Sequence, residues 1–352
     1  MKQSFEGLDE AADRARFSRQ LRLAEIGEAG QRRISQSRIV LVGCGALGSH
    51  AAAALARAGV RGLRIIDRDL VEMSNLPRQV LFDEADALEG VPKAVAAAAA
   101  LRHIDSRITV EAIVADLNRA NAEALLGDCD VMIDGCDNYE TRYLLNDVAV
   151  KLNIPWVYGG CIGVEGRSML IVPDRSPCLR CVFPEPPPPG SEGTCETVGI
   201  LGTAAAVIAN CQATAALRWI VDGDDASAGE FVAIDIWRNE FRVNNMTHLR
   251  REDCPCCATR SFDFLDGRRG SGAAELCGRD AIQILAPRGE SLDLAKLHDN
   301  LAGLGPLKRT AYFVRADIDG FELSVFPDGR AIIRGTTDPA VARSLYAKYV
   351  GH

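Results

Sequence analysis

The 352-residue sequence lacks the features that mark several common classes of protein. It contains only five histidines, and no Ser-His-Asp arrangement can be read in it. A formal net charge of −8 argues against a general nucleic-acid-binding protein. Residues 1–20 are highly charged and have no apolar core of the kind that a signal peptide needs. We therefore expect a soluble cytoplasmic protein without a nucleic-acid partner.

One stretch, Gly199–Val221, is apolar enough to be taken for a membrane span. It is dominated by alanine and contains Asn210, Gln212 and Arg218, and three polar groups inside a bilayer would be costly. We interpret it as a long core helix and expect no membrane association. A length of 352 residues suits one large domain plus a small one, and a hydrophobic fraction of 47% is typical of a globular protein.

A short β-branched run, Ile39–Val42, leads directly into Gly43-Cys44-Gly45-Ala46-Leu47-Gly48, and an alanine-rich segment, Ser49–Ala58, follows. Strand, G-x-G-x-x-G turn and helix in this order let the backbone approach a nucleotide closely, and the helix N-terminus offers unpaired N–H groups. Many α/β proteins carry this pattern without binding a dinucleotide, so its meaning depends on the motifs that follow.

The next expected strand, Leu63–Ile66, ends at Asp67, and Asp69 follows. A carboxylate about 20 residues beyond a glycine loop can accept hydrogen bonds from a ribose. A polar loop, Ser74-Asn75-Leu76-Pro77-Arg78-Gln79, comes next, and Lys93 opens a further helix directly after a proline. The guanidinium of Arg78 and the ammonium of Lys93 are suited to holding a triphosphate.

A further buried strand, Val131–Ile133, ends in Asp134-Gly135-Cys136-Asp137-Asn138. Such strand ends face the ligand crevice of an open α/β sheet, where an exposed aspartate like Asp137 can bind Mg²⁺ beside phosphates. It is equally compatible with the sequence that Asp137 caps the helix expected at Tyr139–Leu152.

Two C-x-x-C pairs, Cys178 with Cys181 and Cys254 with Cys257, lie far apart in the chain. Paired cysteines in a protein without secretory features predict Zn²⁺ bound by four thiolates, and Cys256 would be the spare neighbour. A closed four-thiolate site leaves no position for water. The predicted role is therefore in folding and not in catalysis.

Residues Phe183–Thr197 include four consecutive prolines, which exclude a helix or a central strand. The stretch is typical of a crossing loop, and it ends near Cys195. A cysteine just before a helix is well placed to be a reactive nucleophile. A bystander cysteine fits the spacing equally well.

Glycine, arginine and serine accumulate around 260–272 and indicate a linker. We place the boundary between a nucleotide-binding domain, residues 1–267, and a small α+β domain, residues 268–352. The small domain shows no catalytic constellation. Its expected order is strand, helix, three strands and helix, at Ala281–Ala286, Leu292–Leu301, Thr310–Ile318, Phe321–Phe326, Ala331–Arg334 and Pro339–Tyr349.

Taken together, these motifs resemble the E1-like adenylyltransferases, the group that includes the ThiF, MoeB and HesA proteins and the cores of ubiquitin-activating enzymes. The resemblance covers roughly residues 17–258. It rests on the order and spacing of Arg19-Gln20, the glycine loop, Asp67 with Asp69, the Ser74–Gln79 loop, Lys93, Asp137-Asn138, the cysteine pairs and Thr194-Cys195. It implies a Rossmann-like, doubly wound mixed sheet with the small α+β domain attached.

The resemblance also implies an activity: adenylation, with ATP and Mg²⁺, of the C-terminal glycine of a ubiquitin-like sulfur carrier protein that ends in Gly-Gly. Asp67 would bind the ribose, and Asp137 would bind Mg²⁺ with Asn138 beside it. The other implied nucleotide contacts are Gly43, Gly45, Ala46, Gly48, Asp69, Ser74, Asn75, Arg78 and Lys93.

Three further roles follow only from the resemblance. Arg19 would reach the γ-phosphate of ATP in the other subunit of a homodimer, although a solvated helix face would also explain this residue. Cys195 attacks the adenylate or receives sulfur in some members of the group. No rhodanese domain is evident in the tail, so the sulfur donor is expected to be a separate cysteine desulfurase or rhodanese-like protein.

Three other functions are compatible with parts of the sequence. A member of the same group could adenylate another carboxylate or an RNA substrate, and an NAD-dependent oxidoreductase would also use the glycine loop. A dehydrogenase needs neither the Ser74–Gln79 loop nor the cysteine pairs, and a non-catalytic scaffold would not need Asp67, Arg78, Lys93 and Asp137 together. The motifs do not separate thiamin, molybdopterin, cysteine and tRNA-thiolation carriers.

Overall fold

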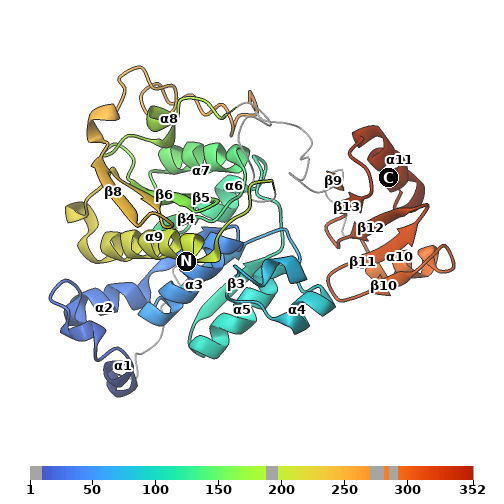
Figure 1. The fold of residues 1–352 in the computed structure, drawn as a ribbon, viewed down its shortest axis with the longest axis horizontal. Helices are drawn as coiled ribbons and strands as arrows, with labels where there is room; N and C mark the ends of the chain where they lie inside the picture. The colour runs from blue at the N-terminus through green and yellow to red at the C-terminus, as the bar shows by residue number, and fades with distance from the viewer. Residues whose placement is uncertain (1–9, 188–196, 270–280, 285–291, 352) are drawn as a thin grey trace. The chain divides into compact units, whose positions relative to one another are not determined.

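The run at Ile39–Val42 forms β1 (Arg38–Val42), the third strand of an eight-stranded sheet in a computed structural model of the chain. The structure describes residues 10–187, 197–269, 281–284 and 292–351. The chain divides into two units, Met1–Arg269 and Gly270–His352, each with its own sheet (Figure 1).

The large sheet has the order β3-β2-β1-β4-β5-β6-β7-β8, in which the first five strands are parallel and the last three antiparallel. The expected doubly wound mixed sheet is thus confirmed. Its other strands are β2 (Gly62–Ile66), β3 (Thr109–Ile113), β4 (Val131–Asp134), β5 (Trp156–Ile162), β6 (Glu165–Ile171), β7 (Glu230–Asp235) and β8 (Glu240–Asn245).

The register of β1 decides where the site forms. Val42, its last residue, pairs with Ile66 of β2 on one side and with Asp134 of β4 on the other. The chain leaves β1 toward β2 but returns to β4 on the opposite side, so a topological switch point lies between β1 and β4. Ligands bind at such points, beyond the carboxyl ends of the strands.

Helices cover both faces of this sheet (Figure 1). Alanine-rich helices pack on one face around Ile39, Leu41 and Ile65, and the opposite face is filled by Val40, Trp156 and the side chains of α7. The helices of this unit are α1 (Glu10–Arg16), α2 (Gly27–Gln36), α3 (Ala46–Ala58), α4 (Glu84–Glu89), α5 (Lys93–Ile104), α6 (Ala122–Leu126), α7 (Tyr139–Leu152), α8 (Leu179–Val182) and α9 (Gly202–Asp222).

The apolar stretch read as a core helix is α9, which packs on α3 and on β4, β5 and β6. Its inner face is buried, and Gln212 on that face donates to the carbonyls of Asp134 and Val157 at 2.7 and 3.2 Å. The outer face of α9 remains accessible, and only 39% of its most apolar 18-residue stretch is buried. By length and composition, α9 is a helix that could cross a membrane.

The second unit contains an antiparallel sheet of order β10-β11-β12-β13-β9, with its core between the sheet and two helices. Its elements are β9 (Ala281–Ile284), α10 (Leu294–Leu301), β10 (Leu307–Arg309), β11 (Val314–Ile318), β12 (Phe321–Val325), β13 (Ala331–Arg334) and α11 (Pro339–Tyr349).

The sequence did not predict β10, and β11 begins at Val314, later than the strand expected at Thr310–Ile318. The hydroxyl of Thr310 accepts from the N–H groups of Tyr312 and Phe313 at 3.1 and 3.2 Å. These bonds make a turn between β10 and β11, because a threonine hydroxyl can compete with the sheet for backbone donors. The sheet therefore has five described strands instead of four.

We predict that Gly48→Ala destabilises the protein and Gly45→Ala does not. A Cβ on Gly48 would lie 2.0 Å from the carbonyl oxygen of Gly43, whereas the nearest heavy atom to a Cβ on Gly45 is 3.9 Å away. Because the clash at Gly48 involves backbone, it should cost at least about 2 kcal/mol in the free energy of unfolding, measured by urea titration. Equal stability of the two variants would contradict the close contact between the turn and α3.

Candidate active site at the carboxyl ends of the parallel strands

Two backbone turns meet at the switch point. Gly43 has φ +84°, and its carbonyl oxygen would lie 2.2 Å from a Cβ on Gly135 of the β4–α7 loop. Glycine is required at both positions because any side chain would fill this contact. Gly45 is the N-cap of α3 and provides no side-chain cap, so the first-turn N–H groups of α3 are available to an anion.

Asp67 directly follows β2, and its carboxylate holds the backbone of the glycine turn. Its Oδ2 accepts from the N–H of Cys44 at 2.6 Å, and its Oδ1 accepts from the N–H of Asp69 at 2.7 Å. Burial raises the pKa of Asp67, and the nearby Lys93 opposes this effect only in part. Both oxygens retain a second lone pair, so the predicted contact to a ribose stays chemically open.

Two ion pairs lie beyond the carboxyl ends of β2 and β3. Lys93, the first residue of α5, donates from Nζ to Oδ2 of Asp69 at 3.0 Å and is only 4% exposed. Arg68 donates from Nη1 to Oδ1 of Asp116 at 2.9 Å. Burial lowers the pKa of Arg68, but Asp116 and Asp69 outweigh it, so the pKa is raised and the guanidinium stays charged.

The Ser74–Gln79 loop packs tightly onto itself and against α9. Oδ1 of the buried Asn75 accepts from the N–H of Glu72 at 3.0 Å, which leaves its Nδ2 to donate elsewhere. Arg78 donates to the carbonyl of Ser74 at 2.6 Å. A Cβ on Gly202 would lie 2.9 Å from the carbonyl oxygen of Pro77, so the N-terminus of α9 lies against this loop.

The β4–α7 loop separates a buried carboxylate from an exposed one. Asp134 is fully buried and accepts from Nε of Arg142 at 3.1 Å and from the N–H of Cys136 at 2.9 Å. Burial raises the pKa of Asp134, although Arg142 acts in the opposite direction. Asn138, and not Asp137, caps α7, accepting from the N–H of Thr141 at 2.9 Å. The exposed Asp137 is therefore not used as the helix cap.

Arg19 is not brought to this site in its own chain. It is exposed, and the neighbouring Gln20 donates to the carbonyl of Ala58, at the C-terminal end of α3. The glycine turn lies at the opposite end of α3, about 18 Å away at 1.5 Å per residue. An arginine side chain cannot cover this distance. Cys195, the other residue predicted to act on the adenylate, lies outside the described residues.

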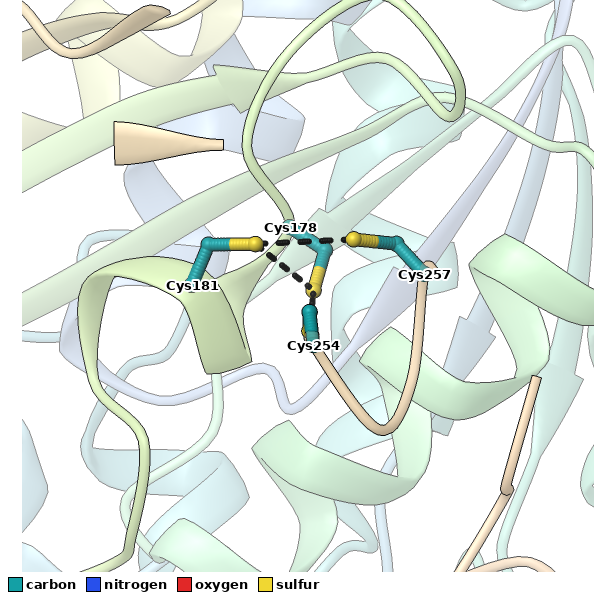
Figure 2. Close-up of side chains that lie close together, drawn as sticks. All are labelled: Cys178, Cys181, Cys254 and Cys257. Carbon is teal, nitrogen blue, oxygen red and sulfur yellow. Dashed lines mark hydrogen bonds between the residues drawn. The ribbon is translucent and has the colours of Figure 1, made fainter. Parts of the chain in front are cut away.

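The four predicted metal ligands form one buried cluster (Figure 2). The sulfur of Cys178 lies 3.9 Å from that of Cys181 and 3.6 Å from that of Cys254, and Cys181 lies 3.4 Å from Cys257. A tetrahedral thiolate site with metal–sulfur bonds near 2.3 Å needs sulfurs about 3.8 Å apart, so the cluster fits a zinc ion. Cys256 is not one of these four cysteines, and its sulfur accepts from Nδ2 of Asn146 on α7 at 3.1 Å.

Several contributors to the site were not anticipated from the sequence. Asp134, Arg142 and Gln212 hold the β4–α7 loop, and Arg68 joins β2 to the loop after β3. For Asp134 a signal existed, since a carboxylate that ends a buried strand needs a partner. Arg142 lies in the second turn of the following helix and was the obvious candidate for it.

Comparison with known proteins gives a consistent result. The profile of the ThiF family matches residues 17–256. The sulfur carrier protein ThiS adenylyltransferase of Bacillus subtilis is 39% identical over 337 residues, which covers 96% of this chain and 99% of that protein. The SAMP-activating enzyme E1 of Haloferax volcanii is 38% identical over 251 residues, 71% of this chain and 91% of that one.

Solved structures show the same fold. MccB of E. coli bound to ATP superposes with a TM-score of 0.57 at 22% identity, covering 65% of this chain and 69% of MccB. MccB with MccA-N7isoASN gives a TM-score of 0.60 at 22% identity and covers 72% of this chain and 76% of MccB.

Proposed function

The chain belongs to the ThiF family, and we propose that it uses ATP to adenylate the C-terminal glycine of a ubiquitin-like sulfur carrier protein. The observation that carries this proposal is the geometry of the switch point. There α3 begins without a side-chain cap, and the loop that carries the exposed Asp137 contacts the glycine turn. Lys93 pairs with Asp69 directly after β2. The carrier is proposed from the relatives, whose names refer to ThiS and SAMP.

The reaction is a nucleophilic substitution at phosphorus. An oxygen of the carrier's terminal carboxylate attacks the α-phosphorus, the bond from the α-phosphorus to the bridging oxygen breaks, and pyrophosphate leaves with the electron pair. The product is an acyl adenylate. Catalysis then consists of positioning and of stabilising negative charge on the phosphates.

The predicted contacts divide this work between them. Asp67 accepts from the ribose, Arg78 and Lys93 stabilise phosphate charge, and Asp137 binds Mg²⁺ with Asn138 beside it. Asp134 is not available for the metal because it is buried against Arg142. The glycine turn and its flanking polar loop complete the set with Gly43, Gly45, Ala46, Gly48, Asp69, Ser74 and Asn75.

A zinc ion bound by Cys178, Cys181, Cys254 and Cys257 would join two segments that are distant in the sequence. One segment follows β6 and forms α8; the other follows β8. All four thiolates are buried, and the sulfur spacings given above suit a tetrahedral ion. The zinc supplies no chemistry to the adenylation in this proposal.

A homodimer would bring Arg19 to the nucleotide. The N-terminus of α9 lies against the Pro77–Arg78 backbone, and near its C-terminus Val221 packs against Gly30 of α2, close in sequence to Arg19. If two copies pack α9 against α9 in antiparallel fashion, the Arg19 segment of one copy comes to the nucleotide loop of the other. Arg19 would then act on the nucleotide bound by the other subunit. It cannot act on the nucleotide of its own chain, because that site lies too far away.

The accessible face of α9 suits such packing. A hollow of about 480 Å³ lies between α9 and the sheet, lined by Val207, Cys211 and Thr214 of α9 and by Val232 of β7. Val243 of β8, which is 65% exposed, pairs with Val232 and extends the same apolar face. A second copy packed on this face would bury these apolar side chains on both sides.

The segment that carries Cys195 lies between two parts of the nucleotide-binding unit. Residues on both sides of the segment that carries Cys195 are anchored to the nucleotide unit. Tyr143 donates to the carbonyl of Phe183 at 2.8 Å, and the N–H of Gly163 donates to the carbonyl of Gly199 at 2.9 Å. We propose that Cys195 can attack the adenylate and that sulfur comes from a separate cysteine desulfurase or rhodanese-like protein.

The decisive experiment is ATP–pyrophosphate exchange with a panel of carriers that end in Gly-Gly. We expect exchange with one carrier and its loss when the last glycine of that carrier is deleted. Arg78→Ala should lower the exchange rate about 100-fold, because it removes charge stabilisation from the phosphates.

The matched control for Arg78 is Lys151→Ala, which removes an exposed cation at the far end of α7 and should leave exchange unchanged. ATP, and not NAD, should raise the melting temperature. ATP binding without exchange for any carrier would move the substrate to a different carboxylate, and stabilisation by NAD alone would overturn the proposal.

The zinc proposal predicts about one zinc per chain in purified protein, measured by elemental analysis. Cys178→Ser and Cys257→Ser should each lose the metal. Cys256→Ser should keep it, because Cys256 is not one of the four clustered ligands and its sulfur accepts from Asn146. Full zinc content in Cys257→Ser together with loss in Cys256→Ser would show that the ligand assignment is wrong.

The trans role of Arg19 predicts complementation. Arg19→Ala and Asp137→Ala should each be nearly inactive, whereas the two variants co-expressed should recover about a quarter of wild-type activity, since half of the dimers then contain one intact site. Co-expression of Asp137→Ala with Lys93→Ala is the control and should recover no activity. Both residues act in the nucleotide site of their own chain, so each site of a mixed dimer still lacks one of them. No recovery in the first pair would refute a trans contribution.

A further inference from the structure

Gln79 ends the Ser74–Gln79 loop, and the oxygen of its buried side-chain amide lacks a hydrogen-bond partner among the described residues. The residue is 4% exposed, and its backbone N–H donates to the carbonyl of Asn75 at 3.0 Å. Its side-chain Oε1 is completely buried, yet no hydrogen bond to it exists within the described part of the chain. Buried amide oxygens that hold a protein together are almost always paired, so the oxygen of Gln79 does not tie its loop to a neighbouring segment.

The amide lies over the glycine turn. Nε2 of Gln79 is 3.9 Å from the position that a Cβ would occupy on Gly45, the N-cap of α3. The space above Gly45 is thus bounded by the open end of a helix and by a primary amide. Because the oxygen and nitrogen of an amide exchange places by a half-turn, the amide can present either atom to a ligand.

The surroundings identify the chemistry of that ligand. The uncapped first-turn N–H groups of α3 begin beside Gly45, and Lys93 lies close enough to Cys44 of the same turn to act on it electrostatically. Arg78 directly precedes Gln79 in the chain. Backbone N–H donors together with two cationic side chains suit a phosphate oxygen. The amide nitrogen of Gln79 adds a neutral hydrogen-bond donor to them. A structural role is less consistent with the geometry, since a side chain that held the two loops together would use its oxygen for a bond.

We propose that Gln79 binds the phosphate chain of ATP, donating a hydrogen bond from its amide to the phosphoryl oxygen that lies over Gly45. This inference rests on the proposed function and adds a residue to it. The contact orients the phosphate without neutralising it, so Gln79 complements the charged groups of Arg78 and Lys93. It also gives a reason for the missing side chain at Gly45, because a Cβ there would reduce the space between the amide and the helix N-terminus.

The test compares Gln79→Met with Gln79→Glu in the full-length protein. Methionine keeps the approximate length of the side chain and removes both polar atoms, whereas glutamate keeps the shape and adds a negative charge. Since Oε1 of Gln79 has no bond to lose, Gln79→Met should unfold at the same or a higher urea concentration than wild type.

Binding of Mg-ATP is measured by calorimetry for each protein, with adenosine as the ligand that lacks phosphates. We expect the Kd for Mg-ATP to rise about 10-fold in Gln79→Met and about 100-fold in Gln79→Glu, in which the carboxylate repels the phosphates. The Kd for adenosine should not change in either variant.

Three results would overturn the inference. The first is an unchanged Kd for Mg-ATP in Gln79→Met. The second is a loss of stability in Gln79→Met together with equal weakening of adenosine and Mg-ATP, which would show a structural role. The third is a wild-type protein that binds no Mg-ATP and shows no pyrophosphate exchange, and only this result would remove the proposed function as well.

Discussion

The contact between the turns at Gly43 and Gly135 is the constraint on which the rest of the site depends. These turns follow β1 and β4, the two strands that flank the switch point, and their backbones touch because neither residue has a side chain. Gly48 extends the contact by letting α3 begin directly against the Gly43 carbonyl. The N-terminus of α3 and the loop that carries Asp137 therefore meet through direct backbone contact, and the side chains around them only support that contact.

The carboxylates around this contact have different roles, and these roles follow from how deeply each carboxylate is buried. Asp67 and Asp134 are buried and accept backbone N–H bonds, so they shape the loops. Asp69 pairs with Lys93 and holds its ammonium group beside the loop that follows β2. Asp137 alone among the predicted acidic ligands is exposed and is not used as a helix cap, which suits a group that binds a hydrated cation.

The sequence predicted those parts of the site that are determined locally. The strand, glycine turn and helix at residues 38–58 follow from β-branching, glycine spacing and alanine content, and the two C-x-x-C pairs follow from ligand spacing alone. Contacts between distant segments were not predictable. No pattern shows that Asp67 accepts from Cys44, that Arg68 pairs with Asp116, or that Arg19 lies at the wrong end of α3. The identity of the α7 cap also depended on backbone geometry, because Asp137 and Asn138 are both good caps.

Helix α9 shows how one element can connect these parts. Its small residues let it lie close to α3, and Gln212 fixes its register on the sheet by donating to the carbonyls of Asp134 and Val157. With that register, Gly202 meets the nucleotide loop at one end and Val221 meets α2 at the other. A buried polar group on an otherwise apolar helix specifies position more than it adds stability. Any shift of α9 along its axis would therefore disturb the nucleotide loop and the Arg19 segment together, which makes the register of α9 a requirement of the site and not only of the fold.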